Sequence, residues 1–405
     1  MKKNRTGLGI LILIFILCMG LFTNLAILKT PINTKPLYVG LILCVVIGVA
    51  YFITRKTSKN GDKFIFLFAS VEAVIGIAML YRLRPETGER QLGWFIVGLV
   101  IFLIIIKFLP DFRNFTKYQN LYLIGVIIFM PMALIFGRDV MGAKNWVFIG
   151  GFSFQPSEFG KIALVLYLAA ALRGFKNKNA KENIRQIFKP GLVVMYSMAC
   201  MVLQNDLGSA LIFFGISVTM LFIATAKKKY IAICLGLAAI GSFVAYKIIP
   251  HVTLRVEIWL NPWKYASDKG YQLVQGFYAI ATGGALGLGL GQGYPGFVPV
   301  NTTDFLFAVI CEELGIVLGI GMIIIYFLLF YRAIRAAFVT DDEFLQLTVV
   351  GFSAMLACQV LVIIGGIFAI IPLTGIALPL VSYGGTSMIT TMFALGILQK
   401  VSGES

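Results

Sequence analysis

Residues 7–28 of the 405-residue chain read GLGILILIFILCMGLFTNLAIL, an apolar run without a single charged side chain. As a helix this run would be about 33 Å long, enough to cross the roughly 30 Å hydrocarbon core of a bilayer. The basic residues before it give it the look of a signal peptide, yet it lacks a small-residue cleavage site and further apolar runs follow. We therefore expect it to remain attached as the first transmembrane helix.

Twelve apolar runs in all follow one another along the chain, in which 59% of residues are apolar, 13% are charged, and the mean hydropathy is +0.91. Soluble proteins do not carry this much apolar sequence, so we predict an all-α, polytopic membrane protein of about twelve transmembrane helices. The seventh and eighth runs are short and lie on either side of a QNDLG turn, which leaves open whether that pair crosses the bilayer fully. The predicted spans are 7–28, 37–54, 64–81, 92–109, 119–137, 157–172, 190–204, 208–226, 230–249, 305–331, 345–371 and 378–399.

Charge is distributed unevenly, with 34 Lys and Arg against 18 Asp and Glu and a net charge of +16. The chain shows no basic stripe with exposed aromatic residues, which argues against a nucleic-acid partner. Instead, 22 of the 34 basic residues lie at the termini and in the loops of one side, against 10 in the loops of the other side. By the positive-inside rule, we expect both termini in the cytoplasm and the large loop 250–304, between the ninth and tenth spans, outside.

Residues that bind metals are scarce in this sequence. It has one histidine, His251, and six cysteines that all fall within apolar runs without CxxC spacing. Zinc sites and disulfide frameworks depend on closely spaced Cys or His residues. We therefore expect neither a zinc site or other Cys/His metal site nor a disulfide framework.

The outer loop 250–304 is too long to be a simple connection, and loops of this length are usually functional or disordered. It is rich in aromatic residues, and its part YQLVQGFYAIAT (271–282) is typical of a short amphipathic or re-entrant helix. Aromatic residues at a membrane surface also serve as headgroup anchors. The motif GQGYPG (291–296) formally matches a dinucleotide fingerprint, but no strand precedes it, so we interpret these glycines as sites of tight turns or close approach to a ligand.

Ionisable side chains within apolar runs are costly unless they are paired or hydrated, so each marks a candidate site. In FQPSEFGK, Glu158 and Lys161 are three residues apart and are expected on one helix face. They either line a polar cavity or form an ion pair that locks two helices. Asp206, in the QNDLG turn, either caps the next helix or faces the cavity. Glu72, alone in the third run, is expected to be satisfied by a neighbouring helix.

The last third of the chain adds further polar groups. Asp304, in TTDFLFAVICEELG, is placed to cap the tenth span, whereas Glu312 and Glu313 inside that span need partners or water. In PLVSYGGTS, Ser382 and Tyr383 precede a helix start whose backbone N–H groups are suited to receive an anion. Most of these groups map to the outer half of the membrane, where they would suit an amphiphile with a charged head and a lipid tail.

Seven motifs occur in a fixed order: GAKNW, FSFQPSEFGKIAL, QNDLGSAL, RVEIWLNPW followed by GYQL, GGALGLGLGQG, TTDFLFAVICEELG and PLVSYGGTS. Each is weak alone, but the ordered set resembles the SEDS family of FtsW, RodA and SpoVE over residues 64–401. Members of that family typically have ten spans. The resemblance therefore implies a family core at 64–405, preceded by two additional transmembrane helices at 1–63.

This resemblance implies a peptidoglycan glycosyltransferase that polymerises lipid II at the outer face of the cytoplasmic membrane, in complex with a class B penicillin-binding protein. In that reaction the 4-hydroxyl of an acceptor sugar attacks the anomeric carbon of a donor, with inversion, and a lipid pyrophosphate leaves. The step needs a base for the hydroxyl proton and positive charge for the pyrophosphate. No cofactor is certain, and a divalent cation at the pyrophosphate stays open. The expected contacts are lipid II, the penicillin-binding protein and membrane lipid.

The chain departs from the family pattern at three positions. The family has its proposed catalytic Asp where this chain has Tyr265, and the nearest carboxylate is Asp268. We hypothesise that Asp268 substitutes as the base; the rival interpretation is a weak or inactive member. Asn145 stands where the family favours Arg, and Thr302 where it favours His. The candidate substrate-binding residues are Lys144, Glu158, Lys161, Asp206, Arg255, Gln272, Asp304, Glu312, Ser382 and Tyr383.

Two functions of other classes stay open beside the polymerase. Many helices with buried charges would also suit a lipid II flippase, and Tyr265 adds weight to a scaffold without catalysis in the division or elongation machinery. The polar residues concentrate in the outer loop, whereas a transporter needs them across the full membrane depth, so their placement favours the polymerase. The resemblance leaves open whether the chain serves cell division, cell shape or sporulation.

Overall fold

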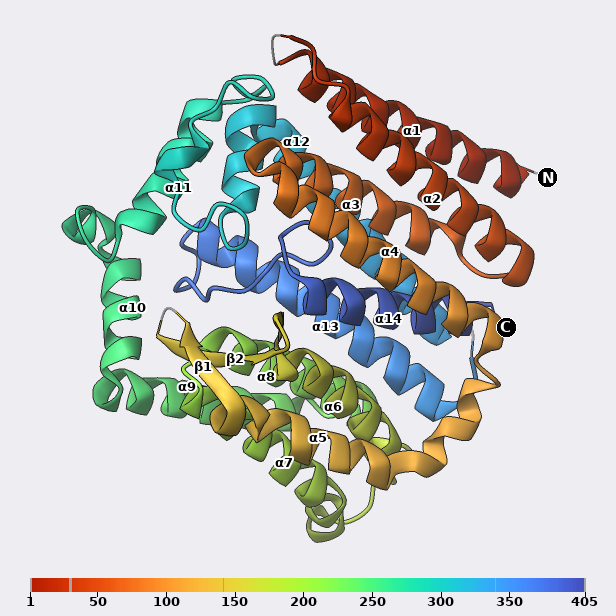
Figure 1. Cartoon of the computed structure of the whole chain (residues 1–405). Coiled ribbons are helices and arrows are strands. Elements are labelled where there is room, and N and C mark those ends of the chain that lie inside the picture. The colour runs from red at the N-terminus through yellow and green to blue at the C-terminus, as the bar shows by residue number, and fades with distance from the viewer. Residues whose placement is uncertain (1, 29–30, 141, 339, 404–405) are drawn as a thin grey trace.

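A bundle of long helices makes up most of the computed structural model, which describes residues 2–28, 31–140, 142–338 and 340–403 (Figure 1). Within this part of the chain, ten helices are long and apolar enough to cross a membrane, whereas α6 and α14, which correspond to two further predicted spans, have only 17 residues each. The long helices are α1 (Lys2–Ile27), α2 (Lys35–Thr57), α3 (Lys63–Leu83), α4 (Pro85–Phe108), α5 (Gln119–Phe136), α6 (Pro156–Leu172), α7 (Ala180–Leu203), α8 (Leu207–Thr225), α9 (Lys228–Ile248), α12 (Leu306–Arg335), α13 (Glu343–Ile367) and α14 (Gly385–Val401).

Two predicted boundaries are wrong by several residues. Helix α7 begins ten residues before the predicted start at 190, because Pro190 lies inside the helix. The hairpin partners are therefore about 36 Å (α7) and 28 Å (α8) long at 1.5 Å per residue, so neither is too short to cross a bilayer. Helix α14 begins at Gly385 rather than 378, because the apolar stretch before it is a loop.

The loops at one end of the bundle contain more structure than the sequence predicts. A three-stranded antiparallel sheet, β1 (Gly137–Val140), β2 (Ala143–Ile149) and β3 (Phe152–Phe154), connects α5 to α6. The long loop holds α10 (Pro250–Leu260) and α11 (Tyr271–Gly283), and the latter confirms the short helix predicted at 271–282. Three-residue to seven-residue 3₁₀ turns complete the chain at η1 (Phe112–Tyr118), η2 (Pro262–Tyr265), η3 (Pro295–Phe297) and η4 (Ala336–Phe338).

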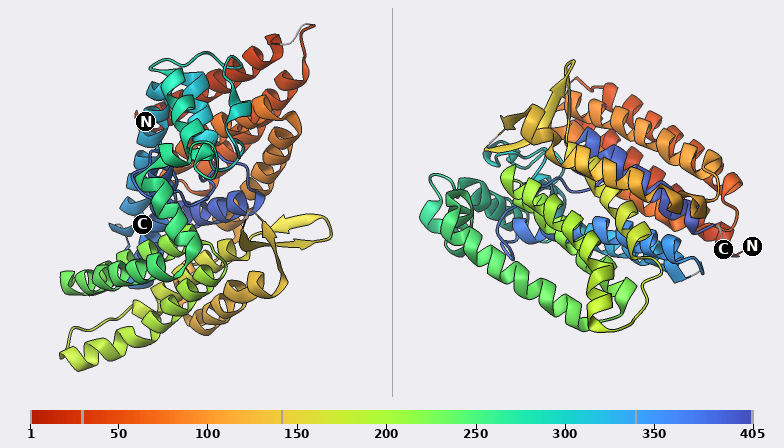
Figure 2. Two further views of the ribbon diagram at one scale, coloured as in Figure 1. Left: turned by 90° about the vertical axis from the view of Figure 1, so that its left-hand side faces the viewer. Right: turned by 90° about the horizontal axis from the view of Figure 1, so that it is seen from below.

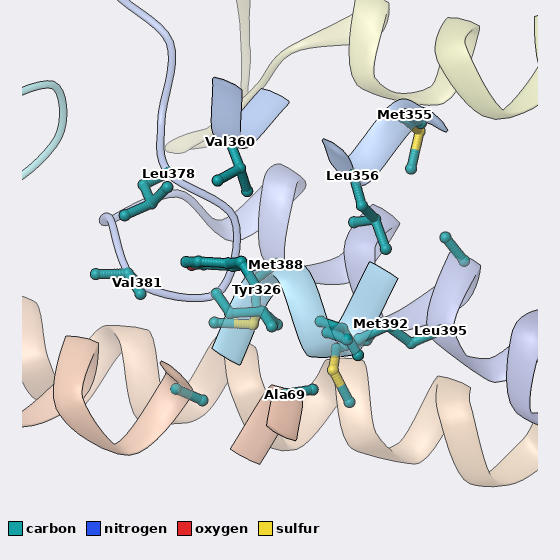
Figure 3. Packing of buried hydrophobic residues seen from close by; sticks show 14 of the residues in the cluster. Ala69, Tyr326, Met355, Leu356, Val360, Leu378, Val381, Met388, Met392 and Leu395 are labelled. Carbon is teal, nitrogen blue, oxygen red and sulfur yellow. The ribbon is translucent and has the colours of Figure 1, made fainter. Parts of the chain in front are cut away.

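Helices α3 and α13 form the centre of the bundle, because 83% and 78% of the residues in their most apolar stretches of 18 residues are buried. Helix α9, in contrast, has no buried residue. Figure 3 shows side chains of this core, among them Ala69, Tyr326, Met388 and Met392. Beyond the core, the labelled N- and C-terminal ends lie together at one end of the bundle, and the sheet, α10 and α11 lie at the other (Figures 1 and 2). The structure therefore gathers the predicted outer segments in one place.

Close backbone contacts fix the loop that precedes α14. A Cβ atom on Gly76 of α3 would lie 2.5 Å from the backbone of Val381, so only glycine allows the loop to approach this closely. A second close approach breaks α12 at Gly315, where φ is +86° and a Cβ atom would meet the carbonyl oxygen of Ala285. The glycine-rich segment after α11 thus packs directly against the broken helix. Positive φ angles at Gly287, Gly289 and Gly291 confirm the predicted tight turns, and the close approach is to protein backbone.

Candidate functional site

Asp206 lies where three segments meet at the sheet end of the bundle. It caps α8, because its Oδ1 accepts a hydrogen bond from the backbone N–H of Ser209 at 2.9 Å. Its Oδ2 accepts from the Ser209 hydroxyl (2.8 Å), the Asn145 amide of β2 (3.0 Å) and the Gln155 amide that precedes α6 (3.1 Å). Four hydrogen-bond donors and the N-terminus of α8 therefore surround this buried carboxylate.

Arg255 reaches the same end from α10. Its guanidinium donates hydrogen bonds to the carbonyl oxygens of Leu373 (3.2 Å) and Thr374 (3.3 Å). One helical turn later, the indole N–H of Trp259 donates to the carbonyl oxygen of Ala369 at 2.7 Å. These contacts dock α10 on the loop between α13 and α14. Burial lowers the pKa of Arg255, while Asp206 and Asp304 oppose that change.

Asp304 completes a charged group that we call the Asp206–Arg255–Asp304 cluster. It lies two residues before α12, and burial raises its pKa to about 6. A hydrogen bond with Thr303 and the charge of Arg255 lower this pKa in part, and the charge of Asp206 raises it. Three segments that are far apart in the sequence thus place two carboxylates and one guanidinium within electrostatic reach.

The loop before α14 is held against the segment that carries Asp304. The Ser382 hydroxyl donates to the carbonyl oxygen of Thr303 at 2.5 Å, and the backbone N–H of Tyr383 donates to that of Thr302 at 2.9 Å. Gln91 of α4 donates to the carbonyl oxygen of Ser382 at 3.1 Å. The Ser382 hydroxyl and the Tyr383 backbone N–H are therefore engaged in contacts within the protein.

Glu158 and Lys161 form a buried ion pair with a distance of 2.7 Å between Nζ and Oε1. The hydroxyl of Thr390 in α14 donates to the other oxygen of Glu158 at 2.9 Å. This arrangement joins α6 to α14 and corresponds to the interpretation of the pair as a lock between two helices. It lies one turn beyond Gln155, so it also supports a donor to Asp206.

A second charged group lies at the start of α12, and we call it the Glu312–Glu313–Arg82 group. Arg82 of α3 forms an ion pair with Glu313 at 3.1 Å. The backbone N–H of Gly291 donates to Glu313 at 2.8 Å, and that of Tyr294 donates to Glu312 at 3.0 Å. The two glutamates thus find the partners that the sequence requires of them. Glu72, in contrast, has no hydrogen-bond partner for either oxygen among the described residues.

Three other predicted site residues make no side-chain hydrogen bond or ion pair with the cluster within the described ranges. The Lys144 ammonium donates to the carbonyl oxygen of Leu134 at 2.7 Å, and Gln272 is half-buried on α11. Asp268 is exposed in the turn before α11, and within the described residues no side-chain hydrogen bond or ion pair joins it to the cluster. Its backbone N–H donates to the carbonyl oxygen of Tyr265 at 3.1 Å.

The sequence assigns no role to three side chains that the structure makes prominent. Asn145 and Gln155 donate hydrogen bonds to Asp206, and Gln155 belongs to the FQPSEFGK motif, in which only Glu158 and Lys161 are predicted site residues. Glu257 of α10 accepts a hydrogen bond of 2.6 Å from the Tyr265 hydroxyl, which raises the pKa of Tyr265. Eight residues of sequence separate that pair, so no helical spacing signals it. Across the described ranges, no three His, Cys, Asp or Glu side chains are grouped so that they could hold a metal ion.

Comparison with known proteins gives consistent matches along most of the chain. The family model FTSW_RODA_SPOVE, described as "Cell cycle protein", matches residues 62–405. Peptidoglycan glycosyltransferase RodA of Mycobacterium tuberculosis is 33% identical over 389 residues, covering 90% of this chain and 82% of the relative. Stage V sporulation protein E of Bacillus subtilis is 32% identical over 369 residues, covering 87% and 99%.

Solved structures match in the same way. A chain from the structure described as "Structural coordination of polymerization and crosslinking by a peptidoglycan synthase complex" is 26% identical, with a TM-score of 0.73 and coverage of 85% of this chain and 98% of that one. The Rod shape determining protein RodA of Thermus thermophilus is 27% identical, with a TM-score of 0.63 and coverage of 84% and 96%.

Proposed function

The chain belongs to the FtsW/RodA/SpoVE family of cell cycle proteins, and from this premise we propose that it is a peptidoglycan glycosyltransferase of cell-shape maintenance or cell division. It is a multi-pass membrane protein. The substrate that we propose is lipid II, whose charged pyrophosphate and lipid tail suit a charged site beside apolar helices. The observation that carries this proposal is the Asp206–Arg255–Asp304 cluster, because it places acid and cation at one end of a membrane bundle.

We further propose that this end faces the cell exterior and that both termini lie in the cytoplasm. The support is the charge bias, since 22 of the 34 basic residues lie on the side of the termini. Lipid II polymerisation requires a substrate headgroup outside the hydrocarbon core. The proposed sidedness brings such a headgroup to the level of the cluster.

The reaction divides into two tasks that the residues can share. As the acceptor 4-hydroxyl attacks the anomeric carbon, its proton passes to a carboxylate, the new C–O bond forms, and the bond to the lipid pyrophosphate breaks. We assign stabilisation of the departing pyrophosphate to Arg255, whose charge is partly desolvated. For the base we retain Asp268, which is exposed and without an internal side-chain partner among the described residues, with Asp304 as the rival.

The other predicted residues take supporting roles in this proposal. Asp206 positions the cluster, and the Glu158–Lys161 pair positions the helix that supplies Gln155. Lys144, Gln272, Glu312, Ser382 and Tyr383 are proposed to border the substrate. We also propose that α1 and α2 are an addition to a family core. They lie at the edge of the bundle (Figure 1), and the family match begins at residue 62.

A class B penicillin-binding protein is the partner that we propose, on the basis of the likeness to a chain of a peptidoglycan synthase complex. To test this proposal, the purified chain and that partner are incubated together with labelled lipid II in detergent. Polymer is the expected result. Because detergent removes the membrane, a flippase or a scaffold would yield no polymer, and that result with a correctly assembled complex would overturn the proposal.

A further inference from the structure

A groove on the bundle surface lies far from the cluster, between the final turns of α2 and α4. Its volume is about 550 Å³. Both helices end here: α2 ends at Thr57 and α4 at Phe108. The residues that matter for its chemistry are Ile53 and Lys56 of α2 and Leu103, Ile104, Lys107 and Phe108 of α4.

The lining is amphiphilic along the groove. Lys56 and Lys107 are each the penultimate residue of their helix, so both lysines lie at the same end of the groove. One helical turn earlier, Ile53 and Leu103 line the groove with apolar side chains. From Val100 to Phe108 the apolar wall of α4 runs for about 12 Å at 1.5 Å per residue. A ligand that fills it needs an anionic head and an apolar tail.

Neither lysine has a carboxylate partner among the described residues. Lys107 lies over the ring of Phe108, with 4.8 Å between Nζ and the ring centroid. The acidic residues in the adjoining loops are engaged elsewhere, since Asp62 pairs with Arg332 and Asp111 lies near Arg113. The mouth of the groove therefore carries two uncompensated positive charges above an apolar floor.

We propose that this groove is a binding site for one anionic diacyl phospholipid of the bilayer, with its phosphate between Lys56 and Lys107 and an acyl chain along α4. Basic pockets between transmembrane helices recognise anionic lipid headgroups in this way. The proposal is independent of the glycosyltransferase activity. The competing explanation is that the lysines only reflect the charge bias of the loops and the favourable position of a cation at a helix C-terminus, which gives no preference among lipids.

The test is native mass spectrometry of the full chain, purified in detergent and mixed with equimolar phosphatidylglycerol and phosphatidylcholine. We expect one phosphatidylglycerol to be retained in preference to phosphatidylcholine. The double variant Lys56→Ala/Lys107→Ala should lower this preference about 25-fold, since one lysine near a lipid headgroup contributes about fivefold. The double variant Lys56→Arg/Lys107→Arg should retain it.

A matched control is Lys228→Ala/Lys229→Ala, which removes two exposed lysines from the start of α9, on the side of the bundle that the charge bias also assigns to the cytoplasm. This control should leave the preference unchanged. The variant Ile104→Trp, which fills the groove without a change of charge, should reduce the amount of bound lipid. Equal retention of the two lipids by the unaltered chain, or equal losses in the groove and control variants, would overturn the proposal.

Discussion

Two groups of charged side chains lie at the same end of the bundle, and each combines two carboxylates with one arginine. In the Glu312–Glu313–Arg82 group, the guanidinium contacts a carboxylate directly at 3.1 Å and backbone N–H groups of the glycine-rich segment fill further acceptor sites. In the Asp206–Arg255–Asp304 cluster, the guanidinium donates instead to loop carbonyl oxygens, and its interaction with the carboxylates is electrostatic. The same set of charges thus holds a loop by a direct ion pair in one place, whereas in the other no ion pair joins the guanidinium to the carboxylates among the described residues.

The largest effect on this difference between the two groups is expected from Arg82→Ala. It should lower the free energy of unfolding by about 3–5 kcal/mol, because it leaves the fully buried Glu313 without its partner. Thermal unfolding in detergent measures this loss. Arg84→Ala, an exposed neighbour at the start of α4, should have little effect. A similar stability for both variants would mean that the first group does not lock the loop.

Arg255→Ala tests the second group, the Asp206–Arg255–Asp304 cluster. It should slow lipid II polymerisation about 100-fold to 1,000-fold, the usual cost of removing a group that stabilises transition-state charge. Its unfolding temperature should fall less than that of the Arg82 variant. Lys264→Ala, an exposed cation in the same segment, should retain activity. Full activity of the Arg255 variant would remove this side chain from the reaction.

The pH dependence distinguishes the two candidate bases. If Asp304 takes the proton, activity should rise with pH through about 6 and be roughly tenfold lower at pH 5 than at neutral pH. Asp304→Asn should abolish that activity, whereas Asp268→Ala should leave the profile intact; the reverse result assigns the base to Asp268.

The same titration predicts a stability effect of defined sign. Because burial raises the pKa of folded Asp304 above its ordinary value, its stabilising contribution is complete at low pH and is lost as pH rises through about 6. The unfolding temperature of Asp304→Asn should therefore depend less on pH between 4 and 7 than that of the unaltered chain. An identical pH dependence in both would contradict the raised pKa.

The smallest effect is expected at Asn145, one of the side-chain donors to Asp206. Asn145→Ala should lower the free energy of unfolding by about 1 kcal/mol, because the other donors to this carboxylate remain. Asn179→Ala, at an exposed helix cap without a side-chain hydrogen bond, is the control. A loss as large as that of Arg82→Ala would mean that the cluster is as rigid as the Glu312–Glu313–Arg82 group.

The sequence predicts the long helices well because each needs about twenty apolar residues, a signal that is local. It also anticipates the Glu158–Lys161 pair, because a spacing of three residues places both side chains on one helix face. The start of α14 was misplaced because an apolar loop and an apolar helix have the same composition. The sheet escaped detection because its strands have only three to seven residues.

The partners within the cluster could not be predicted from the sequence. Asn145 and Asp206 are 61 residues apart, and Arg255 and Thr374 are 119 residues apart. Such contacts depend on how the helices pack, about which hydropathy carries no information. The sequence identified Asp206, Arg255 and Asp304 one by one, and only the fold shows that they form one group.

Helix α9 ends at Ile248, and α10, which carries Arg255, begins at Pro250. No residue of α9 is buried by the rest of the protein, and Figure 2 shows this helix running along the outside of the bundle. Most of α9 is therefore open to lipid, and tilting is one way in which such a helix would accommodate a mismatch between its apolar length and the bilayer. Because a single residue separates α9 from α10, such a tilt would pull on the hydrogen bonds that hold Arg255 and Trp259 on the loop between α13 and α14.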